Sequence, residues 1–210
     1  MIDSKKIIDR KNTQIRLKKV LSEINNKYAK DIASKFTITL GDEFQGLLKS
    51  KNNIMNIIFD IEMEMSPISL RFGIGVGEIS TEINFEYSSE IDGSSYHRAR
   101  TMIEKLEIIK NQYSTRQANI LISSQDKNAE IDKLLNSLFS VCTVLKSKWT
   151  SRQTEIIYAY LLSEENQYKT AEKLGITQSS VNKGLNNSNF YTYKSAIDNI
   201  NSFLSEKEDD

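Results

Sequence analysis

Two adjacent carboxylates, Asp42 and Glu43, stand in the segment TLGDEFQGLL at residues 39–48, between two short apolar runs. Gly41 precedes them, and glycine permits a tight backbone turn and the close approach of a phosphate. Hard cations prefer oxygen ligands, and Mg²⁺ typically binds one or two carboxylates together with substrate phosphates. The segment therefore indicates either a Mg²⁺-dependent nucleotide site or the solvated tip of a β-hairpin.

A second group of polar side chains lies in YKTAEKLGITQSSVNKGL, residues 168–185. Ala171 is small where two helices would approach, and Gly175 suits an inter-helix turn with positive φ. Thr177 can cap the second helix, and the whole spacing is typical of a helix-turn-helix. Six polar side chains would then face DNA, namely Lys169, Gln178, Ser179, Ser180, Asn182 and Lys183.

The charge of this segment leaves two interpretations open. Over residues 146–200, Lys and Arg outnumber Asp and Glu by only two. Affinity for DNA depends strongly on cations that displace counterions from phosphates. An excess of two positive charges is small for a surface that binds phosphates. The segment is either a DNA-binding unit or a trihelical unit used for packing or dimerisation.

The hydrophobic pattern predicts the elements that position both groups. Helical spacing is expected at residues 11–28, 50–63, 94–109 and 126–144, and strands at 36–40, 44–48, 69–79 and 118–123. This order predicts an α+β fold in which helices cover a mainly antiparallel sheet. A boundary near residue 146 separates this α+β domain, residues 1–145, from an all-helical domain at 146–205, and residues 206–210 form a charged tail.

Composition excludes several classes of protein. The 210 residues contain 28 Lys and Arg against 28 Asp and Glu, so no global basic field indicates nucleic acid. Cys142 is the only cysteine, which excludes an intrachain disulfide, and with a single histidine a classical zinc site is not expected. No segment approaches the roughly 18 apolar residues of a membrane span. We therefore expect a cytoplasmic protein with no membrane partner.

Three motifs resemble those of nucleotidyl cyclases. TLGDEFQGLL resembles the GGDEF signature of diguanylate cyclases, with Leu40 in place of the first glycine, and is similar to the hairpin of class III cyclases. SLRFGIGVGEI, residues 69–79, resembles their glycine-bearing strand, and DGSSYHRAR, residues 92–100, the start of their next helix. The resemblance implies a palm-like, ferredoxin-related sandwich. It implies a nucleotide held by Gly41, Arg71, Gly77, Tyr96 and Arg100, and Mg²⁺ held by Asp42 and Glu43.

The whole chain resembles the SatD family, which combines an IDSKK-type start, a GDEFQ hairpin, an RFGIGxGEI strand, a YHxAR helix and a C-terminal helix-turn-helix. The resemblance implies a bacterial cytoplasmic protein. SatD-like chains usually show GDI just before the segment that residues 3–5 match, and cyclase palms hold metal with the Asp of that first strand. This sequence carries neither the strand nor its Asp, and Tyr96 stands where cyclases carry an asparagine. Either the fold is unusual or the reading frame begins upstream of Met1.

These observations favour a DNA-associated regulatory protein, expected to be a homodimer, whose palm-like domain binds a nucleotide or dimerises. Two alternatives stay open, a Mg²⁺-dependent cyclase-like enzyme acting on a nucleoside triphosphate and a catalytically silent dimerisation module. The glycines at positions 73, 75 and 77 fit either close packing of a helix on the strand or a ligand pocket. Arg71 either binds phosphate or caps the edge of the sheet.

Overall fold

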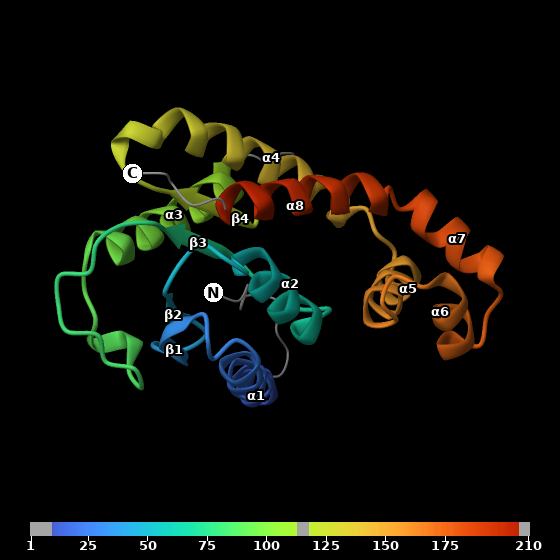
Figure 1. Cartoon of the computed structure of the whole chain (residues 1–210), viewed down its shortest axis with the longest axis horizontal. Helices are drawn as coiled ribbons and strands as arrows, with labels where there is room; N and C mark the ends of the chain where they lie inside the picture. The colour runs from blue at the N-terminus through green and yellow to red at the C-terminus, as the bar shows by residue number, and fades with distance from the viewer. Residues whose placement is uncertain (1–9, 113–117, 206–210) are drawn as a thin grey trace.

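A computed structural model describes residues 10–112 and 118–205 of the chain (Figure 1). The first part contains α1 (Arg10–Lys27), β1 (Ile32–Ile38), β2 (Phe44–Leu48), α2 (Ile54–Met65), β3 (Phe72–Gly75), α3 (Ser94–Gln112), β4 (Ile120–Ser123) and α4 (Ala129–Ser147). The second contains α5 (Ser151–Leu162), α6 (Gln167–Leu174), α7 (Gln178–Asn187) and α8 (Phe190–Ser205). The predicted α+β class and the predicted order of elements are confirmed. The predicted chain start at residues 3–5 and the charged tail at 206–210 lie outside the described residues.

The strands of the described residues form two two-stranded sheets, where the sequence predicts one mainly antiparallel sheet. β1 and β2 are antiparallel, with Ile38 opposite Phe44, as a hairpin requires. β3 and β4 are parallel, with Phe72 opposite Ile120, because α3 lies between them in sequence and returns the chain to the same end of the sheet. The larger palm-like arrangement stays a prediction.

The main core lies between the helices and the two small sheets. It gathers apolar side chains from α1, α2, β3, β4, α4 and α8, with Leu17 and Met65 fully buried. Figure 1 shows α8 running back from α7 alongside α4, and its residues Ile200 and Leu204 belong to this core. The last helix therefore stabilises the α+β part as well as the helical part.

A second core lies inside the helical part. It consists of Ile156, Ile157, Tyr160, Ala171, Val181, Leu185 and Phe190. Because α8 begins in this core with Phe190 and ends in the first with Leu204, it joins the two parts, and the predicted boundary near residue 146 stays a prediction. No helix among the described residues has the length and apolar character to cross a membrane.

Candidate nucleic-acid interface

α5 supports the pair formed by α6 and α7. Thr150 caps α5 in a capping box, because its hydroxyl accepts from the backbone N–H of Gln153 while the Gln153 side chain accepts from the Thr150 N–H. Ile156 and Ile157 are buried on the side of α5 that faces α6 and α7. Reciprocal capping of this kind satisfies two N–H groups that would otherwise lack partners, so the start of the unit is well determined by its sequence.

The turn between α6 and α7 depends on one glycine. Gly175 has φ 62° and ψ 36°, the left-handed conformation that glycine adopts without steric cost. The N–H of Ile176 donates to the carbonyl of Ala171 at 3.0 Å, and the N–H of Gly175 donates to that of Glu172 at 3.2 Å. These bonds close α6 in the manner of a Schellman motif. The predicted role of Gly175 is confirmed.

α7 is held with a defined face toward α5. The hydroxyl of Thr177 accepts from the N–H of Ser180 at 3.1 Å, which confirms the predicted cap. Val181 and Leu185 are completely buried. A Cβ at Gly184 would lie 2.8 Å from the Ile156 side chain, so α5 and α7 pack closely there. The opposite face of α7 is therefore turned away from the core.

Five of the six predicted DNA-binding residues are exposed, namely Lys169, Ser179, Ser180, Asn182 and Lys183. Gln178 is half-buried instead, and its amide donates to the side chain of Gln167, which in turn donates to the hydroxyl of Tyr191. This chain of bonds connects α7 with α6 and α8. Gln178 thus has a structural contact that its position in the sequence does not reveal.

α6 adds polar groups beside the exposed face of α7. Asn166 caps α6 by accepting from the N–H groups of Tyr168 and Lys169. Lys169 contacts the Glu164 carboxylate at 2.6 Å, and hydrogen bonding to that lysine lowers the pKa of Glu164. Tyr168 is exposed and was not among the predicted site residues. The sequence could have indicated Tyr168, because it lies in the first turn of α6. In helix-turn-helix motifs this first helix crosses the DNA backbone.

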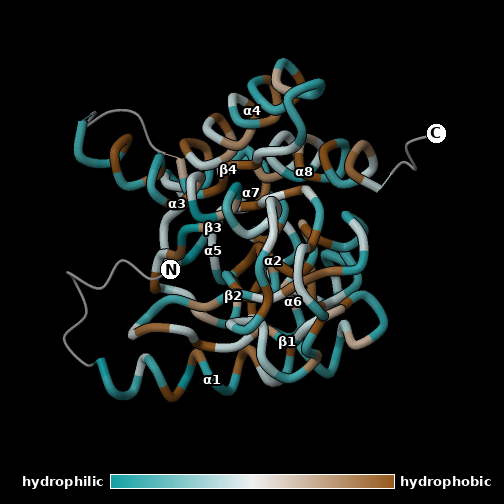
Figure 2. The backbone as a smooth tube through the Cα atoms, turned by 90° about the vertical axis from the view of Figure 1, so that its left-hand side faces the viewer, coloured by the Kyte–Doolittle hydropathy of each residue, from teal (hydrophilic) through white to brown (hydrophobic). Residues whose placement is uncertain are grey.

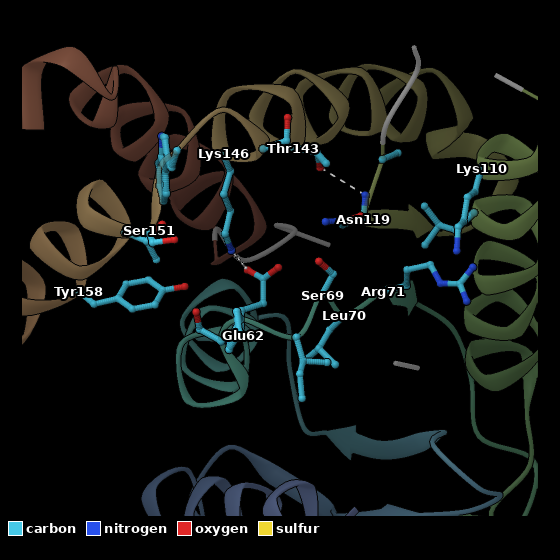
Figure 3. Close-up of a pocket in the computed structure, with 18 of the residues that line it drawn as sticks. Glu62, Ser69, Leu70, Arg71, Lys110, Asn119, Thr143, Lys146, Ser151 and Tyr158 are labelled. Atoms are coloured by element: carbon cyan, nitrogen blue, oxygen red, sulfur yellow. Dashed lines mark hydrogen bonds and ion pairs between the residues drawn. The ribbon is translucent and has the colours of Figure 1, made fainter. Parts of the chain in front are cut away.

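A cavity of about 680 Å³ lies where α5 meets the α+β part (Figure 3). Lys146 of α4 and Glu62 of α2 form an ion pair in its wall, with Nζ and Oε2 2.6 Å apart. Burial by itself lowers the pKa of Lys146, but the Glu62 carboxylate outweighs it, together with Tyr193 and Tyr158, and the pKa is raised. Tyr158 also lines the cavity, and its ring makes an edge contact with Phe59 of α2. These contacts connect α5 with α2 and α4.

The predicted metal ligands lie at the hairpin turn. Gly41 has φ 60°, and Asp42 and Glu43 follow it, both half-buried, before β2 begins. The Gln14 amide of α1 donates to the Gly41 carbonyl at 3.0 Å. Among the described residues, no group of three or more His, Cys, Asp or Glu side chains could hold a metal ion. Two carboxylates can suffice when substrate phosphates complete the shell, so Mg²⁺ at this turn stays a prediction.

The glycine-bearing strand packs directly against α3. A Cβ at Gly73 would lie 2.2 Å from the Ala99 carbonyl oxygen, and one at Gly75 would lie 1.8 Å from that of Ser95. Close packing of a helix, one of the two interpretations of these glycines, therefore applies at both positions. At the end of the strand, the Arg98 guanidinium donates to the Val76 carbonyl at 2.8 Å.

The remaining predicted nucleotide residues are spread over this region. Arg71 lines the cavity beside Lys110 of α3 (Figure 3). Arg100 is exposed and lies 3.7 Å from Glu104, so the arginine at the strand end is Arg98, two positions before the predicted one. Burial raises the pKa of Tyr96 to about 12. Nucleotide binding by these residues stays a prediction.

The model of the SatD family matches residues 1–201 of the chain. No curated protein and no solved structure matches it.

Proposed function

The chain belongs to the SatD family, and we propose that it is a DNA-associated regulatory protein that inserts α7 into the major groove. The observation that carries the proposal is the arrangement of α5, α6 and α7. Val181 and Leu185 hold one face of α7 on α5, while its other face presents polar side chains to solvent. In helix-turn-helix proteins the second helix enters the major groove and its N-terminal residues contact base edges.

The side chains on this face suit the reading of bases. Asn182 can pair with the N6 and N7 edge of adenine, and Ser179 can donate to or accept from several bases. Lys183 suits either guanine or a phosphate. The contact of Asn182 with Asn186, at 3.0 Å, lies within α7 and orients the amide without burying it.

The electrostatic contribution to binding is expected to be small. Lys169 and Lys183 are exposed on α6 and α7, and Lys173 is exposed on the last turn of α6. If each neutralises one phosphate, the slope of log K against log salt is about −3, at about −0.9 per phosphate. Helix-turn-helix proteins commonly bind paired half-sites as two-fold dimers, and we propose the same for this chain, since two units double the number of phosphate contacts.

The test is DNA binding by three variants of the full chain. Sequences are first selected from a random duplex pool, and affinity is then measured by fluorescence anisotropy across a salt series. Lys183→Ala should weaken binding to all sequences and reduce the salt slope by about one per binding unit. Asn182→Ala should relax the preference at one base pair, with a loss of about 1–3 kcal/mol on the preferred site.

Lys105→Ala is the matched control, because Lys105 is an exposed helical lysine on α3, outside the proposed interface. Its affinity and salt slope should equal those of the wild type. The proposal is wrong if Lys183→Ala and Lys105→Ala behave alike, or if no sequence is enriched above the starting pool.

A further inference from the structure

α4 carries an exposed apolar stripe beside its buried face. The stripe consists of Ile131, Leu134, Leu138 and Val141, whose side chains are 41%, 62%, 39% and 58% exposed. The adjoining face of the helix is buried through Leu135, Phe139 and Cys142. Figure 2 shows α4 at the outer edge of the molecule, with hydrophobic residues interspersed among hydrophilic ones along it.

The spacing of the stripe is that of a helix pair. Successive members are three, four and three residues apart, which is the a and d spacing of residues that face a partner helix. Single exposed apolar residues are common on protein surfaces and need no explanation. Four of them in line extend over about 15 Å, at 1.5 Å per residue. A surface helix normally presents polar side chains on its outer face, so this stripe indicates a partner.

The charges along α4 indicate which partner fits. No charged residue occurs from Leu134 to Leu145. The start of α4 carries Glu130, Asp132 and Lys133, a net negative charge in which Lys133 pairs with Glu130 at 2.6 Å, whereas Lys148 lies exposed directly after the last turn. Two copies of α4 in antiparallel orientation therefore bring the acidic start of each beside the basic end of the other. Antiparallel helices also align their dipoles favourably. A parallel pair would instead place like charges together.

We propose that a second copy of this chain covers the stripe, with the two α4 helices antiparallel about a two-fold axis at Leu138. In this arrangement Leu138 packs on its own counterpart, and Leu134 packs beside Val141 of the second copy. Such an interface is isologous, so it closes on itself and stops at two chains. Figure 1 shows α4 over the α+β part, well apart from α6, so DNA binding by a single helical unit does not depend on this interface.

The first test is the oligomeric state of the full chain in sedimentation equilibrium, over concentrations from micromolar to near millimolar. The wild type should dimerise, and Leu134→Glu should raise the dimer dissociation constant at least a hundredfold, since the symmetric interface contains the substitution twice. Leu162→Glu is the matched control, because Leu162 is 59% exposed on α5, close to the exposure of Leu134. It should leave the dissociation constant unchanged.

The second test is disulfide formation between chains, which reports the orientation of the helices. Leu138→Cys should cross-link, because the two thiols meet at the axis. Ile131→Cys should not, because its counterparts are separated along the helices by about 21 Å, at 1.5 Å per residue, against a limit of about 7 Å between Cα atoms of a disulfide. The native Cys142 is buried and should not interfere.

Three results would overturn the proposal. If the wild type stays monomeric at every concentration, a second copy of the chain does not cover the stripe. Equal effects of Leu134→Glu and Leu162→Glu would remove the stripe from the interface. Equal cross-linking of Leu138→Cys and Ile131→Cys would contradict the antiparallel arrangement. None of these results depends on whether the chain binds DNA, so they are distinguishable from a failure of the proposed function.

Discussion

Replacing Lys146 by methionine should destabilise the protein by about 3 kcal/mol, because it leaves the Glu62 carboxylate in place without its partner. The two side chains are only 21% and 11% exposed, and Nζ and Oε2 lie 2.6 Å apart. Removing one member of a buried ion pair costs about 3–5 kcal/mol, and the residual exposure of Lys146 places the loss at the lower end. Since domains of this kind are stable by about 5–15 kcal/mol, the loss is large enough to measure with confidence.

The assay is urea unfolding of four chains in a double-mutant cycle: wild type, Lys146→Met, Glu62→Met and the double variant. A buried pair can often be replaced by apolar residues at little cost, so the double variant should be more stable than either single one. Lys133→Met is the matched control. Lys133 pairs with Glu130 on the same helix, also at 2.6 Å, but both side chains are largely exposed.

An exposed pair contributes about 0–1 kcal/mol, so the control should lose far less stability than Lys146→Met. If Lys146→Met and Lys133→Met lower the free energy of unfolding by equal amounts, burial does not govern the strength of the Lys146–Glu62 ion pair. In that case this ion pair contributes little to holding α2 and α4 together.

Two further predictions concern backbone conformation and pH. Gly175→Ala should lower the free energy of unfolding by about 1 kcal/mol, and Gly41→Ala by a similar amount, because both glycines have φ near 60° with no atom within 4 Å of an added Cβ; an unchanged urea midpoint for either would contradict this. Burial raises the pKa of Tyr96 in the folded protein to about 12, whereas a tyrosine in the unfolded chain has a pKa of about 10. Between these values the unfolded state loses its proton first. The free energy of unfolding should therefore be unaffected by Tyr96 below pH about 10 and should fall as the pH rises toward 12. Tyr96→Phe should make this fall shallower in urea titrations between pH 9 and 12, and an unchanged slope would remove Tyr96 from the cause.

Features determined by neighbouring residues could be predicted from the sequence. The strand Phe44–Leu48 was predicted at the bounds that the structure has, because turn residues and apolar runs are adjacent in the chain. The conformation of Gly175 and the cap by Thr177 followed from rules that involve three or four residues. β3 was predicted to be longer than Phe72–Gly75, because propensity alone does not show where backbone pairing with β4 ends.

Features that depend on distant residues could not be predicted. Lys146 and Glu62 are 84 positions apart, and no local pattern connects them. The return of α8 to the first core depends on the direction in which the chain leaves α7, although Ile200 and Leu204 show ordinary helical spacing. The sequence predicts Gln178 to face DNA, whereas its amide donates to the side chain of Gln167 on the neighbouring helix. In each case the contact is determined by how distant parts of the chain pack together, which the residue types alone do not show.

Gly73 and Gly75 of β3 and Gly77 just after it give different evidence about a ligand. Gly73 and Gly75 are required by packing, since an added Cβ would collide with backbone oxygens of α3, and their presence says nothing about a nucleotide. At Gly77 the nearest atoms to an added Cβ are instead the ends of two side chains, Arg98 Nη1 and Ser94 Oγ, both at 2.4 Å. A polar cluster at the end of a strand, beside the start of a helix, is where a phosphate would be expected. The predicted nucleotide site, which includes Gly77 and Arg100, stays a prediction, and the arginine beside Gly77 is Arg98. The repeated glycine pattern therefore gives it no support at Gly73 and Gly75, where packing on α3 explains the glycines.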